Sequence, residues 1–251
     1  GVASQFIHIT LPDGTRKQVP AGCTVREALT PEGGRRDAKV LAAKINGEPR
    51  DLSCPLEQDA TIEPLTFESA EGREVYRHSS THIMAQAVKE VFPTAQLTIG
   101  PALDDGFYYD FAFDRPFTPE DLEKIEARAI EIMKRGLTVT RSELSKQDAI
   151  KFFQERGEGY KVELINSFDD ASPISLYRQG EFVDLCRGPH LPTTGYVGAF
   201  KLLSTGGAYW RGDAKNAQLQ RIYGTAWRDK KELDAYVTRM EESEKRDHRK
   251  I

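Results

Sequence analysis

The chain has 251 residues, of which 39% are hydrophobic and 29% are charged, with a formal net charge of −4. This composition is typical of a globular protein and excludes the disordered and fibrous classes. No run of about 18 apolar residues occurs, so the sequence predicts no membrane-spanning helix. The negative charge gives no general attraction to nucleic acid, and only a local basic stripe would provide one.

Three cysteines, Cys23, Cys54 and Cys186, are spread far apart along the chain. Their odd number and wide spacing argue against a disulfide framework. Unpaired cysteines are typical of proteins that work in a reducing compartment. We therefore expect a cytoplasmic protein.

Residues 1–67 predict a small domain built from two hairpins and one helix. The stretch QFIHITLPDGTRKQV is two alternating runs joined by an Asp-Gly turn, and AAKINGEPRDL repeats the pattern with Asn-Gly. Between them TVREAL predicts a short helix with Thr24 as its N-cap, and ATIEPLTF predicts a closing strand. These elements predict a mixed sheet with a helix on one face. Residues 68–74 follow as a polar linker.

Residues 68–228 predict a larger α+β domain. It opens with a helix over residues 74–92. The clearest helix is TPEDLEKIEARAIEIMKRG, where Thr118 and Asp121 form a capping box and Gly136 ends the helix. SKQDAIKFFQERG predicts a further capped helix. The predicted strands are GFYYDFAF, LTVTRSEL, YKVELI, ISLYRQ, EFVDLC, AFKLL, GAYWRG and LQRIYGTAW.

Residues 229–251 predict a final helix with an unusual surface. Leu233, Tyr236, Val237 and Met240 form an apolar stripe, after which the sequence is polar on every side. A helix of that kind typically bridges two domains through solvent. We expect a connecting helix at which a longer protein has been cut.

The stretch RHSSTHIMAQAV places His78 and His82 four residues apart on the first helix of the larger domain. Positions i and i+4 share one helix face, so both imidazoles reach a common point. This face lies opposite the apolar arc that contains Ile83, Met84 and Val88. Two solvent-facing histidines would produce the same spacing, and the pair alone does not distinguish a site from an accident.

The stretch EFVDLCRGPHLP supplies a second pair, Cys186 and His190, across a Gly-Pro turn after a predicted strand. Together the two pairs provide the nitrogen and sulfur ligands that zinc takes in a tetrahedral site. A buried cysteine and a surface histidine are the common alternative. Because the chain has only five histidines and three cysteines, the two pairs favour one shared site.

A site of this kind supports hydrolysis with or without a metal. Zinc would polarise a carbonyl or activate water, whereas neutral histidines hold and deprotonate water without it. Lys161 and Asp184 are candidates for positioning the substrate, although Lys161 also fits a solvated strand lysine. Asp184 alternates with Cys186 along its strand, so both are expected on one face. The sequence has no Gly-x-Ser-x-Gly elbow, P-loop or dinucleotide glycine pattern, so it does not support ATP chemistry within these residues.

Other polar residues are weaker candidates for binding substrate. Tyr108 and Tyr109 fit core or wall residues that keep a polar tip. The glycines of STGGAYWRGD, including Gly206, either cradle a ligand or form a hairpin. Candidates for a phosphate-binding stripe, with isolated surface charges as the alternative, are Arg211, Lys215 and Arg221.

Several stretches, taken in order, resemble the N-terminal region of bacterial threonyl-tRNA synthetase, a class II aminoacyl-tRNA synthetase. They are RHSSTHIMAQAVKEVFP, IGPALDDGFYYDF, GEGYKVELI, DLCRGPHLP, KLLSTGGAYWRGD, LQRIYGTAW and EESEKRDHRK, and the resemblance covers essentially the whole chain. It implies an α+β protein in which a ubiquitin-like β-grasp TGS domain (1–67) precedes a larger α+β editing domain (68–228). Residues 229–251 are then a connecting helix.

The resemblance implies hydrolysis of serine wrongly esterified to threonine tRNA. Serine lacks one methyl group of threonine, and one methylene supplies only about 1–3 kcal/mol of discrimination. A second, hydrolytic pocket admits serine and rejects the extra methyl. The implied partner is the 3′ acceptor end of tRNA(Thr) carrying serine, with no membrane partner. We expect this chain to be monomeric and the full-length enzyme to be a homodimer.

Carried over by motif, the resemblance implies one editing site with a catalytic set and a set of substrate contacts. The implied catalytic residues are His78, His82, Lys161, Asp184, Cys186 and His190. The expected substrate contacts are Tyr109, Tyr108, Gly206 and Arg211. In this hypothesis His78 and Lys161 position or activate water, and Asp184 holds the amino group or a ribose hydroxyl of the substrate.

The resemblance also implies which cofactors to expect. Relatives of the alanine type use the same four-ligand pattern for zinc, whereas the threonine branch edits without a bound metal. A lysine at the centre of the site also repels a dication. We therefore expect no cofactor for editing; if zinc binds, its ligands are His78, His82, Cys186 and His190. ATP and a separate zinc belong to a synthetic domain expected beyond residue 251, so this chain is not expected to form threonyl-adenylate.

Two alternatives from other classes stay open. In one, the chain is an RNA-binding module whose histidines are incidental. In the other, it is a structural domain stabilised by zinc and without turnover.

Overall fold

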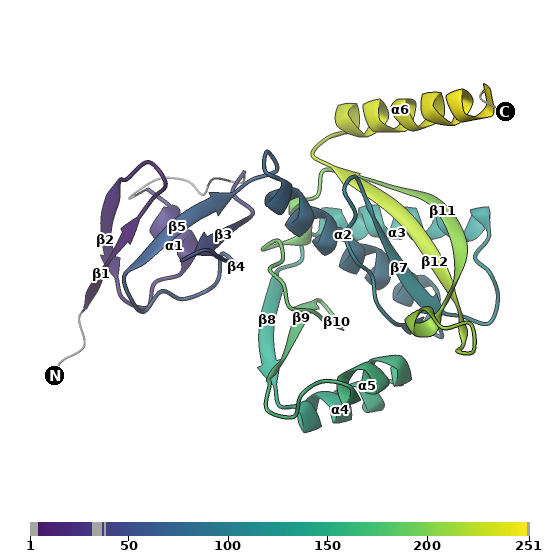
Figure 1. The fold of residues 1–251 in the computed structure, drawn as a ribbon, viewed down its shortest axis with the longest axis horizontal. Helices are drawn as coiled ribbons and strands as arrows, with labels where there is room; N and C mark the ends of the chain where they lie inside the picture. The colour runs from purple at the N-terminus through teal and green to yellow at the C-terminus, as the bar shows by residue number, and fades with distance from the viewer. Residues whose placement is uncertain (1–4, 32–36, 38, 250–251) are drawn as a thin grey trace.

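The computed structural model describes residues 5–31, 37 and 39–249, which form two lobes joined by the long helix α2 (Ala70–Val91). Figure 1 shows the smaller lobe at the N-terminal end and the C-terminal helix α6 (Lys230–Arg249) above the larger lobe. The α+β prediction, with a small β-grasp-like domain first, is confirmed. Among the described residues, no helix is long and apolar enough to cross a membrane.

The first domain has a five-stranded sheet in the order β2-β1-β5-β3-β4. Its elements are β1 (Phe6–Thr10), β2 (Arg16–Pro20), α1 (Val25–Leu29), β3 (Ala42–Ile45), β4 (Glu48–Arg50) and β5 (Ala60–Leu65). The two predicted hairpins are β1–β2 and β3–β4. The predicted cap is also present, because Thr24 and Glu27 form a capping box at α1. Local turn and cap chemistry therefore determines most of this domain.

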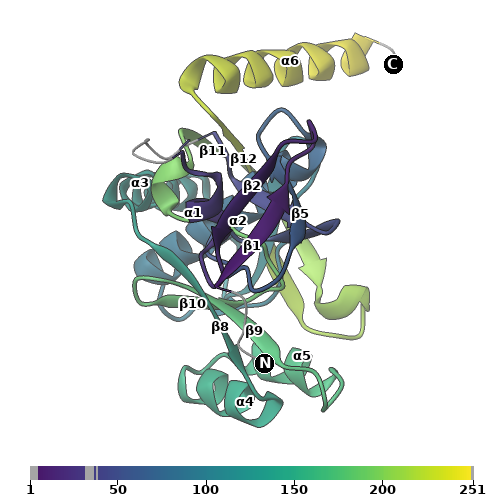
Figure 2. The same cartoon turned by 90° about the vertical axis from the view of Figure 1, so that its left-hand side faces the viewer.

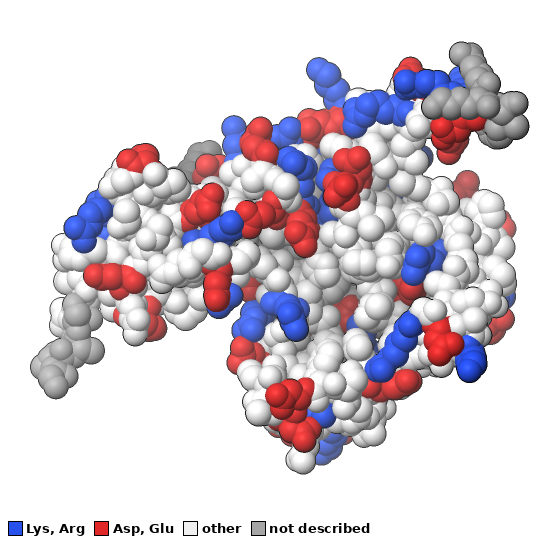
Figure 3. All heavy atoms as spheres, viewed as in Figure 1, with Lys and Arg blue, Asp and Glu red and all other residues white. Residues whose placement is uncertain are grey.

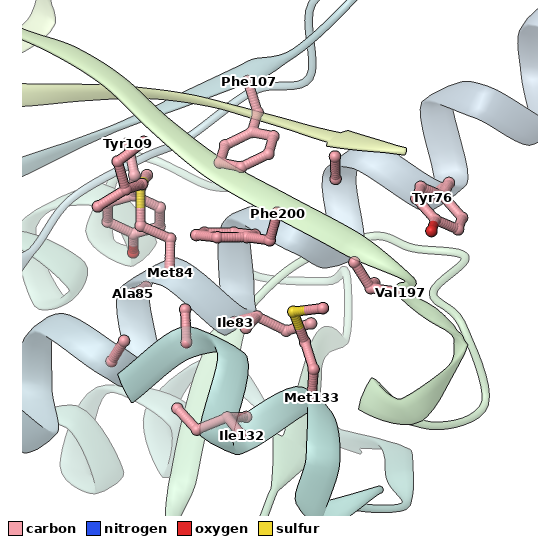
Figure 4. Packing of buried hydrophobic residues seen from close by; sticks show 14 of the residues in the cluster. Tyr76, Ile83, Met84, Ala85, Phe107, Tyr109, Ile132, Met133, Val197 and Phe200 are labelled. Atoms are coloured by element: carbon pink, nitrogen blue, oxygen red, sulfur yellow. The ribbon is translucent and has the colours of Figure 1, made fainter. Parts of the chain in front are cut away.

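The main sheet of the second domain is antiparallel, in the order β11-β12-β7-β6. Its strands are β6 (Gln96–Leu97), β7 (Phe107–Ala112), β11 (Ala199–Tyr209) and β12 (Gln218–Trp227). Helices α2 and α3 (Pro119–Arg135) pack against it, and Figure 4 shows Phe107 and Phe200 of the sheet meeting Ile83, Met84 and Ile132 of the helices. The segment AFKLL and the first half of GAYWRG, predicted as two strands, lie in the single strand β11, which has a register shift at Leu202–Ser204. The prediction that Trp210–Gly212 continues as strand is wrong, because these residues form the 3-10 turn η2.

A smaller antiparallel sheet, in the order β10-β9-β8, carries two short helices. Its elements are β8 (Val139–Leu144), α4 (Lys146–Glu155), α5 (Gly159–Asn166), β9 (Ile174–Gln179) and β10 (Phe182–Leu185). The second domain also contains two short 3-10 turns, η1 (Thr194–Tyr196) and η2 (Trp210–Gly212). Figure 2 shows α4 and α5 at the end of the molecule opposite α6.

The prediction that YKVELI is a strand is wrong, because this segment forms α5. Its buried residues Lys161 and Ile165 are four apart and so lie on one helix face. Ile165 packs with Ala149 and Phe153 of α4. A short apolar run fits a helix or a strand by pattern alone, and here packing on α4 decides.

The prediction of a polar linker at residues 68–74 is also wrong, because α2 begins within it at Ala70. Ser69 caps the helix by accepting a hydrogen bond from the Gly72 N–H at 3.0 Å. Gly72 lies so close to the preceding chain that an added Cβ would be 1.7 Å from the Thr66 carbonyl oxygen. Helix α2 therefore starts directly from the first domain, and Leu65 and Phe67 belong to the same apolar core as the second domain.

The predicted helix over the last residues is confirmed as α6. Leu233 and Tyr236 from its apolar stripe pack against the main core. The Tyr236 ring lies 5.3 Å from the Trp227 ring at the end of β12. The first turns of α6 are thus attached to the second domain.

We expect Thr118→Ala to lower the free energy of unfolding by about 1 kcal/mol, the usual cost of losing an N-cap. The Thr118 hydroxyl accepts the Asp121 N–H at 3.1 Å, and the variant leaves that donor unpaired at the start of α3. Urea denaturation measures the change. Thr238→Ala, an exposed position on α6, is the matched control and should be neutral or slightly stabilising. Equal losses in both variants would contradict the capping role.

Candidate active site

A cavity of about 700 Å³ lies between the first domain, α2, α5 and the segment after β10. Its lining includes five of the six residues predicted to be catalytic: His78, His82, Lys161, Asp184 and Cys186. Tyr109 also lines it. The sixth residue, His190, lies behind Cys186 and lines a separate crevice.

Asp184, near the end of β10, is the buried centre of the site and is only 1% exposed. Its Oδ1 accepts hydrogen bonds from Lys161 Nζ at 2.6 Å and the Leu185 N–H at 2.7 Å. Its Oδ2 accepts the Tyr109 hydroxyl at 2.8 Å and lies 3.4 Å from His82 Nε2. Burial raises the pKa of Asp184, but Lys161, His82 and Tyr109 outweigh it and hold the pKa below its ordinary value of 3.8. Asp184 is therefore an ionised carboxylate at neutral pH.

Cys186 connects two of the histidines. Its Sγ lies 2.8 Å from His78 Nε2 and 3.0 Å from His190 Nε2. On the far side of His190, the Ser79 hydroxyl accepts the Leu191 N–H at 2.8 Å and lies 3.2 Å from His190 Nδ1. Two proton arrangements satisfy these contacts, because each ring nitrogen donates or accepts according to its tautomer. In one, the Ser79 hydroxyl donates to His190 Nδ1, His190 Nε2–H donates to the sulfur, and the thiol donates to His78 Nε2. In the other, every direction is reversed, so that His78 Nε2–H donates to the sulfur and the thiol donates to His190 Nε2.

Burial keeps these groups uncharged. It lowers the pKa of His82 to about 3 and the pKa of His190 well below 6.5. Burial likewise lowers the pKa of His78, and it raises the pKa of the Cys186 thiol to about 12. The alternative of two solvent-facing histidines on α2 is wrong, because His82 is only 3% exposed and His78 is partly buried at the cavity wall. At neutral pH the three imidazoles of the site are therefore uncharged.

The types of ligand atom in this cluster suit zinc, but the distances between the atoms do not. The candidate ligand atoms of the two pairs lie within 4.8 Å of one another, and His82 Nδ1 is buried without a hydrogen-bond partner among the described residues. Around tetrahedral zinc, bonds of about 2.3 Å to sulfur and about 2.1 Å to nitrogen place the two atoms roughly 3.6 Å apart. The Cys186 sulfur lies 2.8 Å and 3.0 Å from the nitrogens of His78 and His190. These are hydrogen-bonding distances, and zinc would require the cluster to widen and the thiol to ionise.

Tyr109 is the one expected substrate contact found among the cavity-lining residues. Tyr108, next to it on β7, faces the other side of the sheet, where its ring lies 3.8 Å from the Arg221 guanidinium. Arg211 donates to the Glu163 carbonyl of α5 at 3.3 Å, outside the cavity lining. Gly206 pairs with Arg221 in the β11–β12 hairpin. Alternation along β7 separates the two tyrosines, and the β11–β12 hairpin holds Gly206 away from the cavity.

The contribution of the first domain to the cavity was not predictable from local sequence patterns. Its strand β4 contributes Glu48, Pro49 and Arg50 to the lining. These residues follow an ordinary Asn-Gly turn, and no local pattern relates them to the histidines more than 25 residues away. Their role depends on how the two domains pack, which local sequence signals do not report.

Comparison with protein families now places both domains. Residues 7–66 match the TGS domain. Residues 174–223 match the threonyl and alanyl tRNA synthetase second additional domain, which is the editing domain. The fold and site thus define a TGS domain followed by an aminoacyl-tRNA synthetase editing domain.

Whole-chain comparison shows which synthetases the chain is similar to. The threonine–tRNA ligase of Symbiobacterium thermophilum is 53% identical over 248 residues, which cover 99% of this chain and 38% of that protein. The ligases of Citrifermentans bemidjiense and Acetivibrio thermocellus are 54% and 52% identical over 98% of the chain, which spans 38% and 39% of their lengths. The chain is an editing-domain-containing relative of the N-terminal part of bacterial threonine–tRNA ligase, and the predicted resemblance is confirmed.

We expect Lys161→Met to lower the free energy of unfolding by about 3–5 kcal/mol at neutral pH, because it leaves a buried carboxylate without its cation. In the unaltered protein, the lowered pKa of Asp184 gives stability that is present above pH 3.8 and lost as the pH falls through the folded value. Without Lys161 the opposing effect of burial raises the folded pKa, so the deficit of the variant should shrink toward pH 4.

Urea denaturation between pH 4 and pH 8 measures this difference. Lys201→Met, at an exposed position on β11, is the matched control and should show a small deficit that does not vary with pH. A deficit of Lys161→Met that stays constant across the range would contradict the ion pair as its cause.

Proposed function

We propose that the cavity hydrolyses the ester of seryl-tRNA(Thr), releasing serine and free tRNA. The observation that carries this proposal is the meeting of the Lys161–Asp184 ion pair and the His78–Cys186 pair at one cavity of the editing domain. An aminoacyl ester is already activated, so an oriented water molecule and a few fixed polar groups suffice for its hydrolysis. The names of the relatives, threonine–tRNA ligases, support threonine tRNA as the nucleic acid.

Lys161 is suited to stabilise negative charge on the ester carbonyl as water attacks. Its ammonium group is fixed by Asp184 at 2.6 Å, and it lines the cavity while being only 2% exposed. A fixed cation at a site that excludes bulk water stabilises a developing oxyanion without reorganising first. His78 is neutral and lines the cavity, and when its Nε2–H donates to the Cys186 sulfur, its Nδ1 is left to accept the proton of the attacking water.

Asp184 has a different role in this proposal from the one expected from sequence. Two donors occupy its Oδ1, and the Tyr109 hydroxyl together with nearby His82 occupies its Oδ2. Little capacity is left for an amino group or a ribose hydroxyl of the substrate. We assign Asp184 to positioning Lys161 and His82.

Binding of tRNA is expected to be local to the cavity mouth. On the face seen in Figure 3, basic and acidic side chains are interspersed and do not form one broad basic surface. Arg50 and Arg187 line the cavity and are placed to contact phosphates of the acceptor end. For the longer protein to which this chain corresponds, the relatives support ligation of threonine to tRNA with ATP, and we extend that activity to it.

We expect the chain to deacylate seryl-tRNA(Thr) faster than threonyl-tRNA(Thr). His78→Ala and Cys186→Ala should each slow seryl release by roughly 100-fold, the lower range for losing acid–base assistance. His8→Ala, at an exposed histidine of the first domain, is the matched control and should act like the unaltered chain. Loss of labelled serine from the tRNA under single-turnover conditions measures the rate.

The same experiment separates the two alternative classes. Tight binding of tRNA without release of serine, in both the unaltered chain and His78→Ala, would indicate an RNA-binding module. A chain that hydrolyses no seryl-tRNA(Thr) and unfolds when a chelator is added would indicate a structural zinc domain. Either result would contradict the proposed hydrolysis.

We infer further that editing proceeds without a bound metal. The short sulfur–nitrogen distances support this inference, because zinc would require the Cys186 sulfur and the nitrogens of His78 and His190 to move apart. We expect purified protein to contain far less than one zinc per chain and to keep its seryl-tRNA hydrolysis in the presence of a chelator. Zinc near one per chain, with activity lost on chelation and restored by zinc, would contradict this inference.

A further inference from the structure

Asp51, the residue after β4 in the TGS domain, reaches across to the segment that carries Cys186 and His190. Its Oδ1 accepts the backbone N–H of His190 at 2.8 Å. Its Oδ2 accepts the hydroxyl of Tyr177, on β9, at 2.7 Å. One carboxylate of the first domain therefore satisfies two donors of the second.

Tyr177 also contacts the segment that carries Cys186 and His190. Its ring lies 4.2 Å from the His190 imidazole. Its hydroxyl is so close to Gly188 that a Cβ at that residue would lie 1.8 Å from the oxygen. Gly188 has a φ of +77°, which a residue with a side chain rarely adopts. Asp51 and Tyr177 together thus fix the turn from Gly188 to His190.

A continuous series of contacts leads from this turn to the cavity. Asp51 holds the His190 backbone, His190 Nε2 lies 3.0 Å from Cys186 Sγ, and Cys186 lies 2.8 Å from His78 Nε2. Among these residues, His78 and Cys186 line the cavity. A shift of the turn would change the distance between the sulfur and the imidazole at the cavity wall.

We propose that Asp51 is a positioning residue of the editing site, supplied by the TGS domain. By fixing the turn that carries Cys186 and His190, it sets the geometry of the His78–Cys186 pair. The hydrolytic site is therefore complete only in the two-domain unit. This inference rests on the proposed hydrolysis of seryl-tRNA(Thr).

The docking of the two domains is extensive enough to support such a role. Leu65 and Phe67 of the first domain share one apolar core with Val75 and Tyr76 of α2. A second polar contact joins the domains at a distance from the cavity, where Arg26 Nη2 donates to the Tyr196 hydroxyl at 2.9 Å. Arg26 is thus a matched control, because it contributes to docking and, among the described residues, forms no hydrogen bond with the turn that carries His190.

A positioning role and a purely structural role differ in kinetics. If Asp51 sets the geometry of the reacting groups, its loss should lower the maximal single-turnover rate and leave the half-saturating concentration of chain almost unchanged. If Asp51 only helps the domains dock, Arg26→Ala should have the same effect as Asp51→Ala. The comparison of these two variants separates the roles.

The experiment measures release of labelled serine from seryl-tRNA(Thr) by the whole chain and its variants. We expect Asp51→Ala to lower the maximal rate roughly 10-fold to 100-fold, as a displacement near 1 Å does at a reacting centre. Asp51→Asn keeps an oxygen that accepts the His190 N–H, so it should recover most of the rate. Arg26→Ala should stay within about 2-fold of the unaltered chain.

Tyr177→Phe removes only one hydroxyl and provides a second, milder variant. We expect it to slow hydrolysis less than Asp51→Ala, and the double variant to be no slower than Asp51→Ala alone, because both changes act through one contact. If Asp51→Ala does not fold, Tyr177→Phe is judged by the same criterion, a lower maximal rate than Arg26→Ala, and Asp51→Asn should stay near the rate of the unaltered chain.

Measuring His78→Ala in parallel separates failure of this inference from failure of the proposed function. If His78→Ala hydrolyses seryl-tRNA(Thr) as fast as the unaltered chain, the proposed function itself is wrong. If His78→Ala is inactive and the Asp51 and Tyr177 variants match Arg26→Ala, only the positioning role of Asp51 is overturned. Additive slowing in the double variant would also overturn it.

Discussion

The ionised carboxylate of Asp184 is the constraint around which the cavity is organised. It is buried in the protein, where an unpaired charge costs several kcal/mol, so the surrounding elements have to bring donors to it. Lys161 comes from α5, Tyr109 from β7 and His82 from α2, while Leu185 adds its own backbone N–H. Four elements distant in sequence therefore meet at one point.

The same burial defines the chemistry that the site is able to perform. Because water is largely excluded, the histidines stay neutral and the Cys186 thiol stays protonated at neutral pH. The single ion pair of Lys161 with Asp184 supplies the fixed charge, which acts strongly at low polarity. Neutral acceptors beside one fixed cation suit the attack of water on an ester better than they suit the binding of a dication.

Local sequence signals predicted the elements whose ends are set by nearby residues. The Asp-Gly and Asn-Gly hairpins formed as expected, and so did the caps at Thr24 and Thr118. The wrong predictions for YKVELI and for residues 68–74 concern segments whose short local pattern fits more than one structure. YKVELI became a helix because it packs on α4, and the supposed linker at residues 68–74 became the start of α2.

The predictions about the site held where spacing within one element decided the outcome, and were incomplete where packing between elements decided it. Pair spacing and family resemblance selected six residues that lie close together in the fold, since His78 and His82 are fixed by one helix and Cys186 and His190 by one turn. Burial of the histidines was not predictable from α2 alone, because other segments pack against their face of the helix. Tyr108 and Tyr109 are adjacent in sequence, yet the alternation of side chains along β7 places them on opposite faces of the sheet.

The conformation of the segment from Cys186 to His190 depends more on groups elsewhere in the fold than on its own residues. Cys186 continues the pairing of β10 with β9, since its backbone N–H donates to the Ser175 carbonyl at 3.2 Å, but the rest of the segment lies outside the two sheets of the second domain. A site on such a segment depends on outside groups to hold its geometry. Ser79 of α2, Tyr177 of β9 and Asp51 of the TGS domain each provide one such contact. Because one of the three belongs to the first domain, the geometry of this segment depends on both domains, whose apolar side chains share one core.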